Sequence, residues 1–91
     1  MTRKRSKLEI SLEILRAVNR GENKPTRIMY RTNLSWIPLK QIFESLITQG
    51  LMEEIELSKR KEYAITQKGK KVLTYFEGMT RLIEYETPKS R

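Results

Sequence analysis

The sequence is short, strongly basic and free of cysteine and histidine, which narrows the range of possible functions. Its 91 residues, 37% of them hydrophobic, are enough for one compact core and too few for two domains of ordinary size. We find neither the roughly 20 consecutive apolar residues of a membrane span nor a signal peptide, so a cytoplasmic protein is expected. Without thiols or imidazoles the chain lacks the commonest nucleophile, general base and metal ligands, so we expect no enzyme activity, metal or cofactor.

The charge of the chain is unbalanced. Nineteen Lys and Arg residues against eleven Asp and Glu residues give a net charge of +8. Such an excess attracts polyanions and accelerates encounter with them, which makes nucleic acid the first expected partner. The alternative is that a surface rich in Lys and Glu reflects solubility at high temperature, a habit of thermophilic proteins. A large uncompensated positive charge favours the nucleic-acid interpretation.

The first predicted element is an amphipathic helix. Ser6 and Glu9 have the spacing of a capping box, in which each side chain satisfies the other residue's backbone N–H. Apolar residues then recur at three- and four-residue steps between Leu8 and Val18. Gly21 is placed to end this helix in the left-handed conformation.

Two further helices follow. Pro25 fits the first turn of a short helix that runs to about residue 31. After a turn, Ser35 is positioned to cap a third helix over about residues 35–49, in which Pro38 is tolerated because it lies in the first turn. Gly50 is expected to close that helix.

From residue 51 the hydrophobic period changes from about 3.6 to 2, which predicts a β-hairpin over residues 51–66. On this pattern Leu51, Ile55 and Leu57 face inward, while Glu54 and Glu56 face water. The tip of the hairpin is strongly basic, because it holds Lys59, Arg60 and Lys61.

The last predicted helix begins after Thr66, which can cap it, and ends before Pro88. At 1.5 Å per residue, twenty residues extend about 30 Å, which is longer than a core of this size. The distal half therefore needs another surface to cover its apolar side. The residues expected to form a dimer interface there are Val72, Phe76, Met79, Leu82 and Ile83.

This order of elements predicts an α+β, mainly α fold: a winged helix-turn-helix of three helices, a β-hairpin wing and a long C-terminal helix. We divide the chain into a DNA-binding domain with a basic N-terminal arm (1–66), a C-terminal helix for dimerisation (67–87) and a disordered tail (88–91). In this architecture the third helix enters a DNA major groove, and the wing reaches the adjacent backbone or minor groove.

The third helix has a buried side and an opposite side that could recognise bases. Lys40 and Gln41 can offer hydrogen bonds to guanine and adenine edges, and Glu44 can accept from cytosine. Ile37 could touch a thymine methyl group. The alternative is an ordinary solvated helix face, and for Trp36 we favour packing under the turn. The candidate recognition residues are Ser35, Trp36, Ile37, Lys40, Gln41, Glu44 and Ser45.

Other basic residues suit phosphate contacts, which position a protein on DNA without identifying its sequence. Three adjacent cations at a wing tip repel one another, so the wing has little structural reason for them. A short basic terminus, by contrast, is often simply disordered. The candidates on the second helix and wing are Arg27, Tyr30, Arg31, Lys59, Arg60 and Lys61, and those of the N-terminal arm are Arg3, Lys4, Arg5 and Lys7.

Two segments carry a resemblance to known proteins. Thr26 to Ser35, TRIMYRTNLS, together with Lys4 to Ile10, resembles a family of small archaeal winged-helix proteins that includes a dimeric, chromatin-associated DNA-binding member of Sulfolobus. Tyr63 to Gly69, YAITQKG, is similar to a signature at the wing-to-helix junction of many winged-helix regulators. The resemblance covers roughly residues 3–75. It implies DNA binding through the third helix and wing, and a homodimer through an antiparallel coiled coil, which Pro88 shortens here.

The favoured function is therefore a DNA-binding transcriptional regulator or nucleoid-associated protein. The alternative is a winged-helix protein-interaction module within a transcription or chromosome complex, without direct DNA contact. An enzyme would have to rely on carboxylates such as Glu54 and Glu56 holding Mg²⁺, which hairpins more often place outward for solubility. RNA is disfavoured, because the sequence lacks clustered aromatic residues for stacking on unpaired bases.

Overall fold

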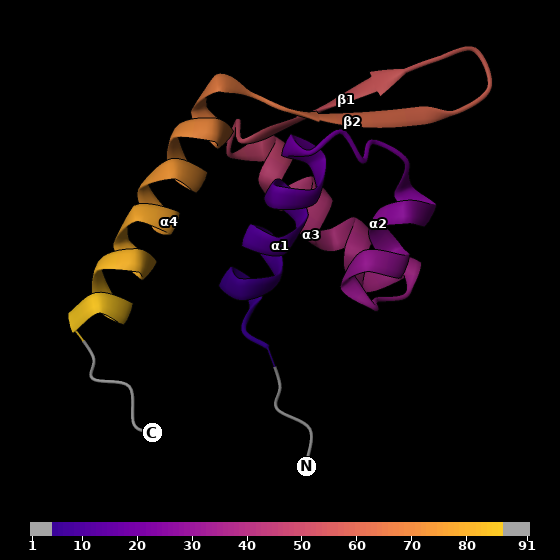
Figure 1. Cartoon of the computed structure of the whole chain (residues 1–91). Coiled ribbons are helices and arrows are strands. Elements are labelled where there is room, and N and C mark those ends of the chain that lie inside the picture. The colour runs from indigo at the N-terminus through magenta and orange to yellow at the C-terminus, as the bar shows by residue number, and fades with distance from the viewer. Residues whose placement is uncertain (1–4, 87–91) are drawn as a thin grey trace.

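The computed structural model describes the backbone of residues 5–86 and the side-chain surroundings of residues 5–83. Three helices and a hairpin precede one long helix, so the predicted mainly helical α+β fold is confirmed. Figure 1 shows α1, α2 and α3 gathered beneath the hairpin, and α4 descending at the opposite end of the molecule from α2. The predicted tail (88–91) lies outside the described residues. The elements are α1 (Lys7–Asn19), α2 (Pro25–Thr32), α3 (Trp36–Thr48), β1 (Met52–Glu56), β2 (Lys61–Ile65) and α4 (Gln67–Glu86).

Helix α1 begins and ends as its sequence predicts. The backbone N–H of Glu9 donates to Ser6 Oγ at 3.0 Å, and the N–H of Ser6 donates to Glu9 Oε1 at 2.8 Å. These two bonds complete the capping box and satisfy donors that no helical carbonyl can reach. At the other end Gly21 has φ +100°, the left-handed conformation that glycine adopts without strain.

The turn between α2 and α3 is tight. Asn33 adopts the left-handed conformation with φ 60°, which ends α2. The next helix, α3, begins three residues later at Trp36. Ser35 is the N-cap, as predicted, but its side chain makes no capping hydrogen bond. Buried Thr32 donates its hydroxyl to the carbonyl of Ile28 at 2.8 Å, so its polar group is satisfied inside the core.

The core lies between the three helices and the base of the hairpin. Phe43 of α3 is 1% exposed and contacts the ring of Tyr63 at a centroid distance of 4.5 Å. The buried face of α3 is the one that the helical period predicts. The hydrophobic core consists of Ile14, Leu15, Val18, Ile28, Leu39, Ile42, Phe43, Leu46, Leu51, Met52, Tyr63 and Leu73.

The inward face of the hairpin differs from the prediction. Strands β1 and β2 pair antiparallel with Met52 opposite Ile65, and Met52 and Tyr63 supply the buried side chains. Ile55 and Leu57, predicted to face inward, are 41% and 39% exposed. Leu51 is buried, but it precedes the strand. The physical reason is that only the base of the hairpin lies over the helices, and its tip extends beyond them (Figure 1).

A single residue, Thr66, joins the hairpin to α4. Its hydroxyl donates to the carbonyl of Gly50 at 2.6 Å and accepts from the N–H of Gly69 at 3.0 Å, so it caps α4 as predicted. A Cβ on Gly69 would lie 2.1 Å from the carbonyl oxygen of Leu51. Glycine therefore permits the close approach of α4 to the start of β1. Further along, Glu77 accepts from Arg16 Nε at 3.1 Å, which ties α4 to α1.

Candidate nucleic-acid interface

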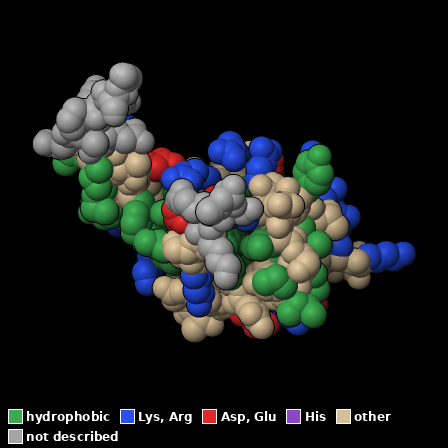
Figure 2. Space-filling view, turned by 90° about the horizontal axis from the view of Figure 1, so that it is seen from below, with side chains coloured by type: hydrophobic (Ala, Val, Ile, Leu, Met, Phe, Trp, Pro, Cys, Tyr) green, Lys and Arg blue, Asp and Glu red, His purple; other side chains and the backbone are tan. Residues whose placement is uncertain are grey.

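Large apolar and polar side chains are exposed on α2 and on the outer face of α3, outside the hydrophobic core. Tyr30 is 90% exposed and Ile37 is 70% exposed. Lys40, Gln41 and Glu44 are also exposed, whereas Ser45 is half-buried and accepts from Gln49 Nε2 at 3.0 Å. Figure 2 shows hydrophobic side chains gathered at the α2 and α3 end of the molecule, with Lys and Arg side chains projecting around them. We call this face the α2–α3 surface.

Trp36 occupies the boundary between this surface and the core. Its ring meets Phe43 edge-on, with centroids 6.1 Å apart and an interplanar angle of 82°, and 37% of the residue remains exposed. Edge-to-face contact is a favourable arrangement of aromatic rings. The side chain therefore packs in part, as expected, and keeps an accessible edge at the first residue of α3.

The two arginines of α2 have different surroundings. Arg27 is exposed and has no hydrogen-bond or ion-pair partner among the described residues. Arg31 donates two hydrogen bonds to the carboxylate of Glu22 in the α1–α2 loop. Its Nε lies 3.1 Å from Oε1, and its Nη2 makes a closer contact with Oε2. The hydrogen bond from Arg31 lowers the pKa of Glu22, and the carboxylate in turn raises the pKa of Arg31. A phosphate must therefore compete with Glu22 for a bonded Arg31, whereas Glu22 attracts Arg27 only through space, without an ion pair or hydrogen bond.

The wing tip is less cationic than the run of three basic residues suggests. Arg60 Nε lies 3.0 Å from Glu62 Oε2, and Lys61 Nζ lies 3.0 Å from Glu54 Oε2. The bond to Glu54 raises the pKa of Lys61. Within the described residues only Lys59 of the three lacks a carboxylate partner. Four glutamates share the hairpin with these cations: Glu53, Glu54, Glu56 and Glu62.

The hairpin is fastened to the loop that precedes α2. The N–H of Tyr63 donates to the carbonyl of Asn23 at 2.9 Å, and Asn23 Nδ2 donates to Glu62 Oε1 at 3.2 Å. Burial is the main cause that raises the pKa of the Tyr63 phenol, which stays neutral. These bonds direct the hairpin over α2, and its tip extends past α2 at the same end of the molecule as the α2–α3 turn (Figure 1).

The N-terminal arm is only partly available for binding. Arg3 and Lys4 lie outside the described residues. Arg5 donates to the Glu13 carboxylate and to the carbonyl of Thr32, so its guanidinium joins α1 to the end of α2. Its expected phosphate contact therefore competes with two internal bonds. Lys7 is exposed at the start of α1.

Helix α4 presents the apolar residues that were expected at a dimer interface. Met79, Leu82 and Ile83 are 51%, 60% and 58% exposed. Val72 and Phe76 are half-buried, and Val72 packs against the protein's own core. Figure 2 shows hydrophobic side chains along this helix as well.

The sequence reasoning overlooked a second basic cluster, at the start of α4. Lys68, Lys70 and Lys71 are all exposed. The first turn of this helix contains no acidic residue. The signal was present in the sequence as the run QKGKK, in which three lysines fall within four residues. The resemblance of YAITQKG to a wing-to-helix signature explains the position of this segment but not its charge.

Two other kinds of site are absent from the part of the chain that the structure describes. No group of three acidic side chains within the described part of the chain is arranged to hold a metal ion. None of the described helices combines the length and hydropathy that crossing a bilayer demands.

Comparisons with known proteins agree with this architecture. A family model described as winged helix-turn-helix matches residues 4–84. Two uncharacterised proteins of Methanocaldococcus jannaschii are similar to the chain. MJ0287 is 35% identical over 69 residues, which are 76% of this chain and 67% of that protein. MJ0290 is 39% identical over 80 residues, which are 88% of this chain but only 36% of that protein.

A solved structure is also similar. The crystal structure of Sso10a-2, a DNA-binding protein from Sulfolobus solfataricus, superposes with a TM-score of 0.74 and 28% sequence identity, covering 89% of this chain and 84% of that one. The resemblance to archaeal winged-helix proteins is therefore confirmed. The chain belongs to the winged helix-turn-helix family.

Proposed function

We propose that the chain binds double-stranded DNA, with α3 in the major groove and the hairpin tip on the adjacent backbone or minor groove. The observation that carries the proposal is the α2–α3 surface. It leaves Tyr30 almost fully exposed and Ile37 mostly exposed, while the opposite face of α3 fills the core. A helix that is buried on one side and bears hydrogen-bonding and apolar groups on the other has what base recognition requires.

The outer face of α3 supplies the groups for recognising bases. Gln41 can pair with adenine through its amide, and Lys40 can donate to guanine. Ile37, which is 70% exposed, suits contact with a thymine methyl group. The remaining candidates from the sequence, Glu44 and the accessible edge of Trp36, lie on the same helix and stay proposals.

The phosphate contacts divide into two groups by their surroundings. Arg27 and Lys59 form no ion pair with a carboxylate among the described residues, so they can bind phosphates without breaking such a bond. Arg31, Arg60 and Lys61 are paired with glutamates at exposed positions. Exposed ion pairs add little to stability, so a phosphate can replace the glutamate. We expect the unpaired group to dominate the salt dependence of binding.

Similarity supports the same function. Sso10a-2 is described as a DNA-binding protein, and it shares both the fold and 28% of aligned residues with this chain. We further propose a nucleoid-associated or transcription-regulatory role, and a homodimer through the exposed apolar residues of α4. The division of the chain at residue 66 remains a prediction within this proposal.

The test is the dependence of affinity on salt, measured with a short fluorescent duplex. Because each phosphate contact contributes roughly 0.9 to the log-log slope, a slope of roughly −4 to −8 per dimer is expected. Replacing Arg27 and Lys59 by Ala should flatten the slope by roughly 1.8 per protomer, at roughly 0.9 for each phosphate contact. Gln41→Ala serves as the control, because it should change preference among sequences while leaving the slope intact. An affinity that does not change between low and moderate salt would refute DNA binding.

One observation favours a second candidate, the protein-interaction module. The wing carries four glutamates, and two of its three tip cations are paired with them, which weakens its attraction for phosphate. On this alternative the exposed Tyr30 and Ile37 would contact a partner protein. The same binding assay separates the two candidates, since a module of this kind gives no shift of duplex even at low salt.

A further inference from the structure

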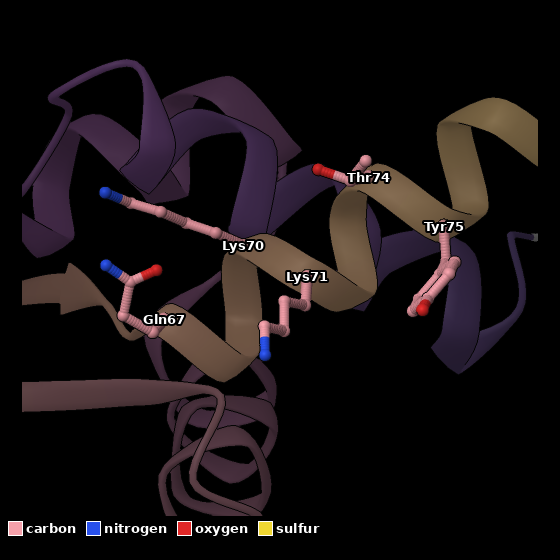
Figure 3. Close-up of a pocket in the computed structure, with 5 residues that line it drawn as sticks. All are labelled: Gln67, Lys70, Lys71, Thr74 and Tyr75. Atoms are coloured by element: carbon pink, nitrogen blue, oxygen red, sulfur yellow. The ribbon is translucent and has the colours of Figure 1, made fainter.

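The lysine cluster at the start of α4 lines a shallow hollow that contains no carboxylate. The hollow has a volume of about 460 Å³ and is lined by Gln67, Lys70, Lys71, Thr74 and Tyr75. Figure 3 shows the side chains of Gln67 and Lys70 on the same side of α4, that of Lys71 pointing another way, and Thr74 and Tyr75 further along the helix. Three other hollows formed by described residues each contain at least one glutamate. This one therefore offers an anion two ammonium groups, an amide, a hydroxyl and an aromatic ring, with no carboxylate to repel it.

Two of the three ammonium groups in this cluster, those of Lys70 and Lys71, are free to bind. Their side chains have no hydrogen-bond or ion-pair partner among the described residues. Lys68 differs, since its ammonium donates to the carbonyl of Gln49 at 2.9 Å, at the end of α3. Further along α4, by contrast, Glu77 forms an ion pair with Arg16 of α1. The carboxylate of Glu77 is thus engaged outside this hollow, and none of the described carboxylates pairs with Lys70 or Lys71.

The positions of these lysines also disfavour the folded state. The first turn of a helix is the positive end of its dipole, where cations are unfavourable and carboxylates are favoured. Like charges three residues apart, as Lys68 and Lys71 are, repel each other as well. A cluster that breaks local rules without a structural benefit is typical of a functional surface. An anionic partner would remove both penalties.

We infer that the hollow around Lys70 and Lys71 binds the phosphate backbone of a second DNA duplex, separate from the one held by the α2–α3 surface. This inference rests on the proposed function. The start of α4 and the wing tip lie at opposite ends of the molecule, so a duplex seated on α2, α3 and the wing leaves α4 free (Figure 1). The exposed phenol of Tyr75, four residues after Lys71, can pack on a deoxyribose beside the contacted phosphates.

Two assays on the full chain test the inference. The first measures affinity for one fluorescent duplex, and the second measures recruitment of that duplex to an identical immobilised duplex by the protein. For Lys70→Ala/Lys71→Ala we expect one-duplex affinity within about twofold of the original. At about 0.1 M salt each lost phosphate contact weakens binding about eightfold, so recruitment should fall by a factor on the order of 10 to 100. Lys70→Arg/Lys71→Arg, which keeps both charges, should retain recruitment.

The outcomes separate this inference from the proposed function. Failure of the unmodified chain to bind one duplex would refute the proposed function itself. One-duplex binding without recruitment, or unchanged recruitment by the alanine variant, would overturn only the inference. Unchanged recruitment by the alanine variant is also the result expected if a dimer joins two duplexes through its two α3 helices. An equal loss in both assays would overturn it too, since the lysines would then belong to the first interface. The thermal unfolding midpoint of the alanine variant should equal or exceed the original.

Discussion

Two glycines of α4 make a matched pair for testing how this helix is seated. Gly69→Ala would place its Cβ 2.1 Å from the carbonyl oxygen of Leu51 and 2.7 Å from Ile65 Cγ1. The same change at Gly78 meets nothing within 4 Å. Both positions are helical, so intrinsic propensity alone would favour Ala over Gly at each by about 1 kcal/mol. Any difference between the two variants must therefore come from the packing at Gly69.

The structure gives the expected size of that difference. To restore an ordinary contact, α4 must move by about 1 Å away from backbone atoms that cannot rotate aside, and overpacking of this kind costs about 1–3 kcal/mol. We expect Gly78→Ala to stabilise the chain by up to about 1 kcal/mol and Gly69→Ala to destabilise it. The two variants should differ by about 2–4 kcal/mol in the free energy of unfolding.

Urea denaturation followed by far-ultraviolet circular dichroism measures both variants on the same scale. For a domain of this size, each kcal/mol also moves the thermal midpoint by about 4–8 °C, which provides an independent readout. If Gly69→Ala were as stable as Gly78→Ala, the close approach of α4 to Leu51 would be refuted. So would our explanation of the glycine in the YAITQKG segment.

Three further predictions use the same structure. Thr66→Ala should cost about 1–2 kcal/mol of unfolding free energy in urea, since it removes the cap of α4 and the bond to Gly50, whereas Thr66→Ser should keep most of it. Arg31 lowers the pKa of Glu22, so the stability that this carboxylate contributes is present above the ordinary carboxyl range and is lost as the pH falls through the lowered value. The stability difference between the original chain and Glu22→Gln should therefore shrink between about pH 6 and about pH 3, and a constant difference would contradict the pairing. Trp36 is the single tryptophan and keeps an accessible edge on α3, so its fluorescence should change on saturation with duplex, and an unchanged spectrum would contradict insertion of α3.

Local rules predicted much of this fold from the sequence. The capping box at Ser6, the glycine ends at Gly21 and Gly50, and the buried face of α3 all depend on residues a few positions apart. Interactions of that range can be identified in a sequence because helix geometry fixes which side chains meet.

The hairpin was predicted less well, because its faces depend on what lies beneath it. Alternation along β1 groups Ile55 with Leu57 but cannot show that the core ends near Met52. Likewise, the pairing of Lys61 with Glu54 is a diagonal contact between strands, and it follows from a register that the sequence alone leaves open. The engagement of Arg5 with Glu13 and Thr32 is a tertiary contact of the same kind.

The one-residue junction at Thr66 has a mechanical consequence. No flexible linker separates β2 from α4, and the Thr66 hydroxyl also bonds the carbonyl of Gly50 just after α3. We therefore expect α3, the hairpin and α4 to move together as one rigid body. A force that swings the far end of α4 is transmitted to the hairpin as a change of tilt. In an assembly of two chains joined along α4, the angle between those helices would accordingly set the distance and relative orientation of the two wings. If the wings bind DNA as proposed, the contacts along α4 would then set the spacing of the bound DNA segments, although these contacts lie far from the bases.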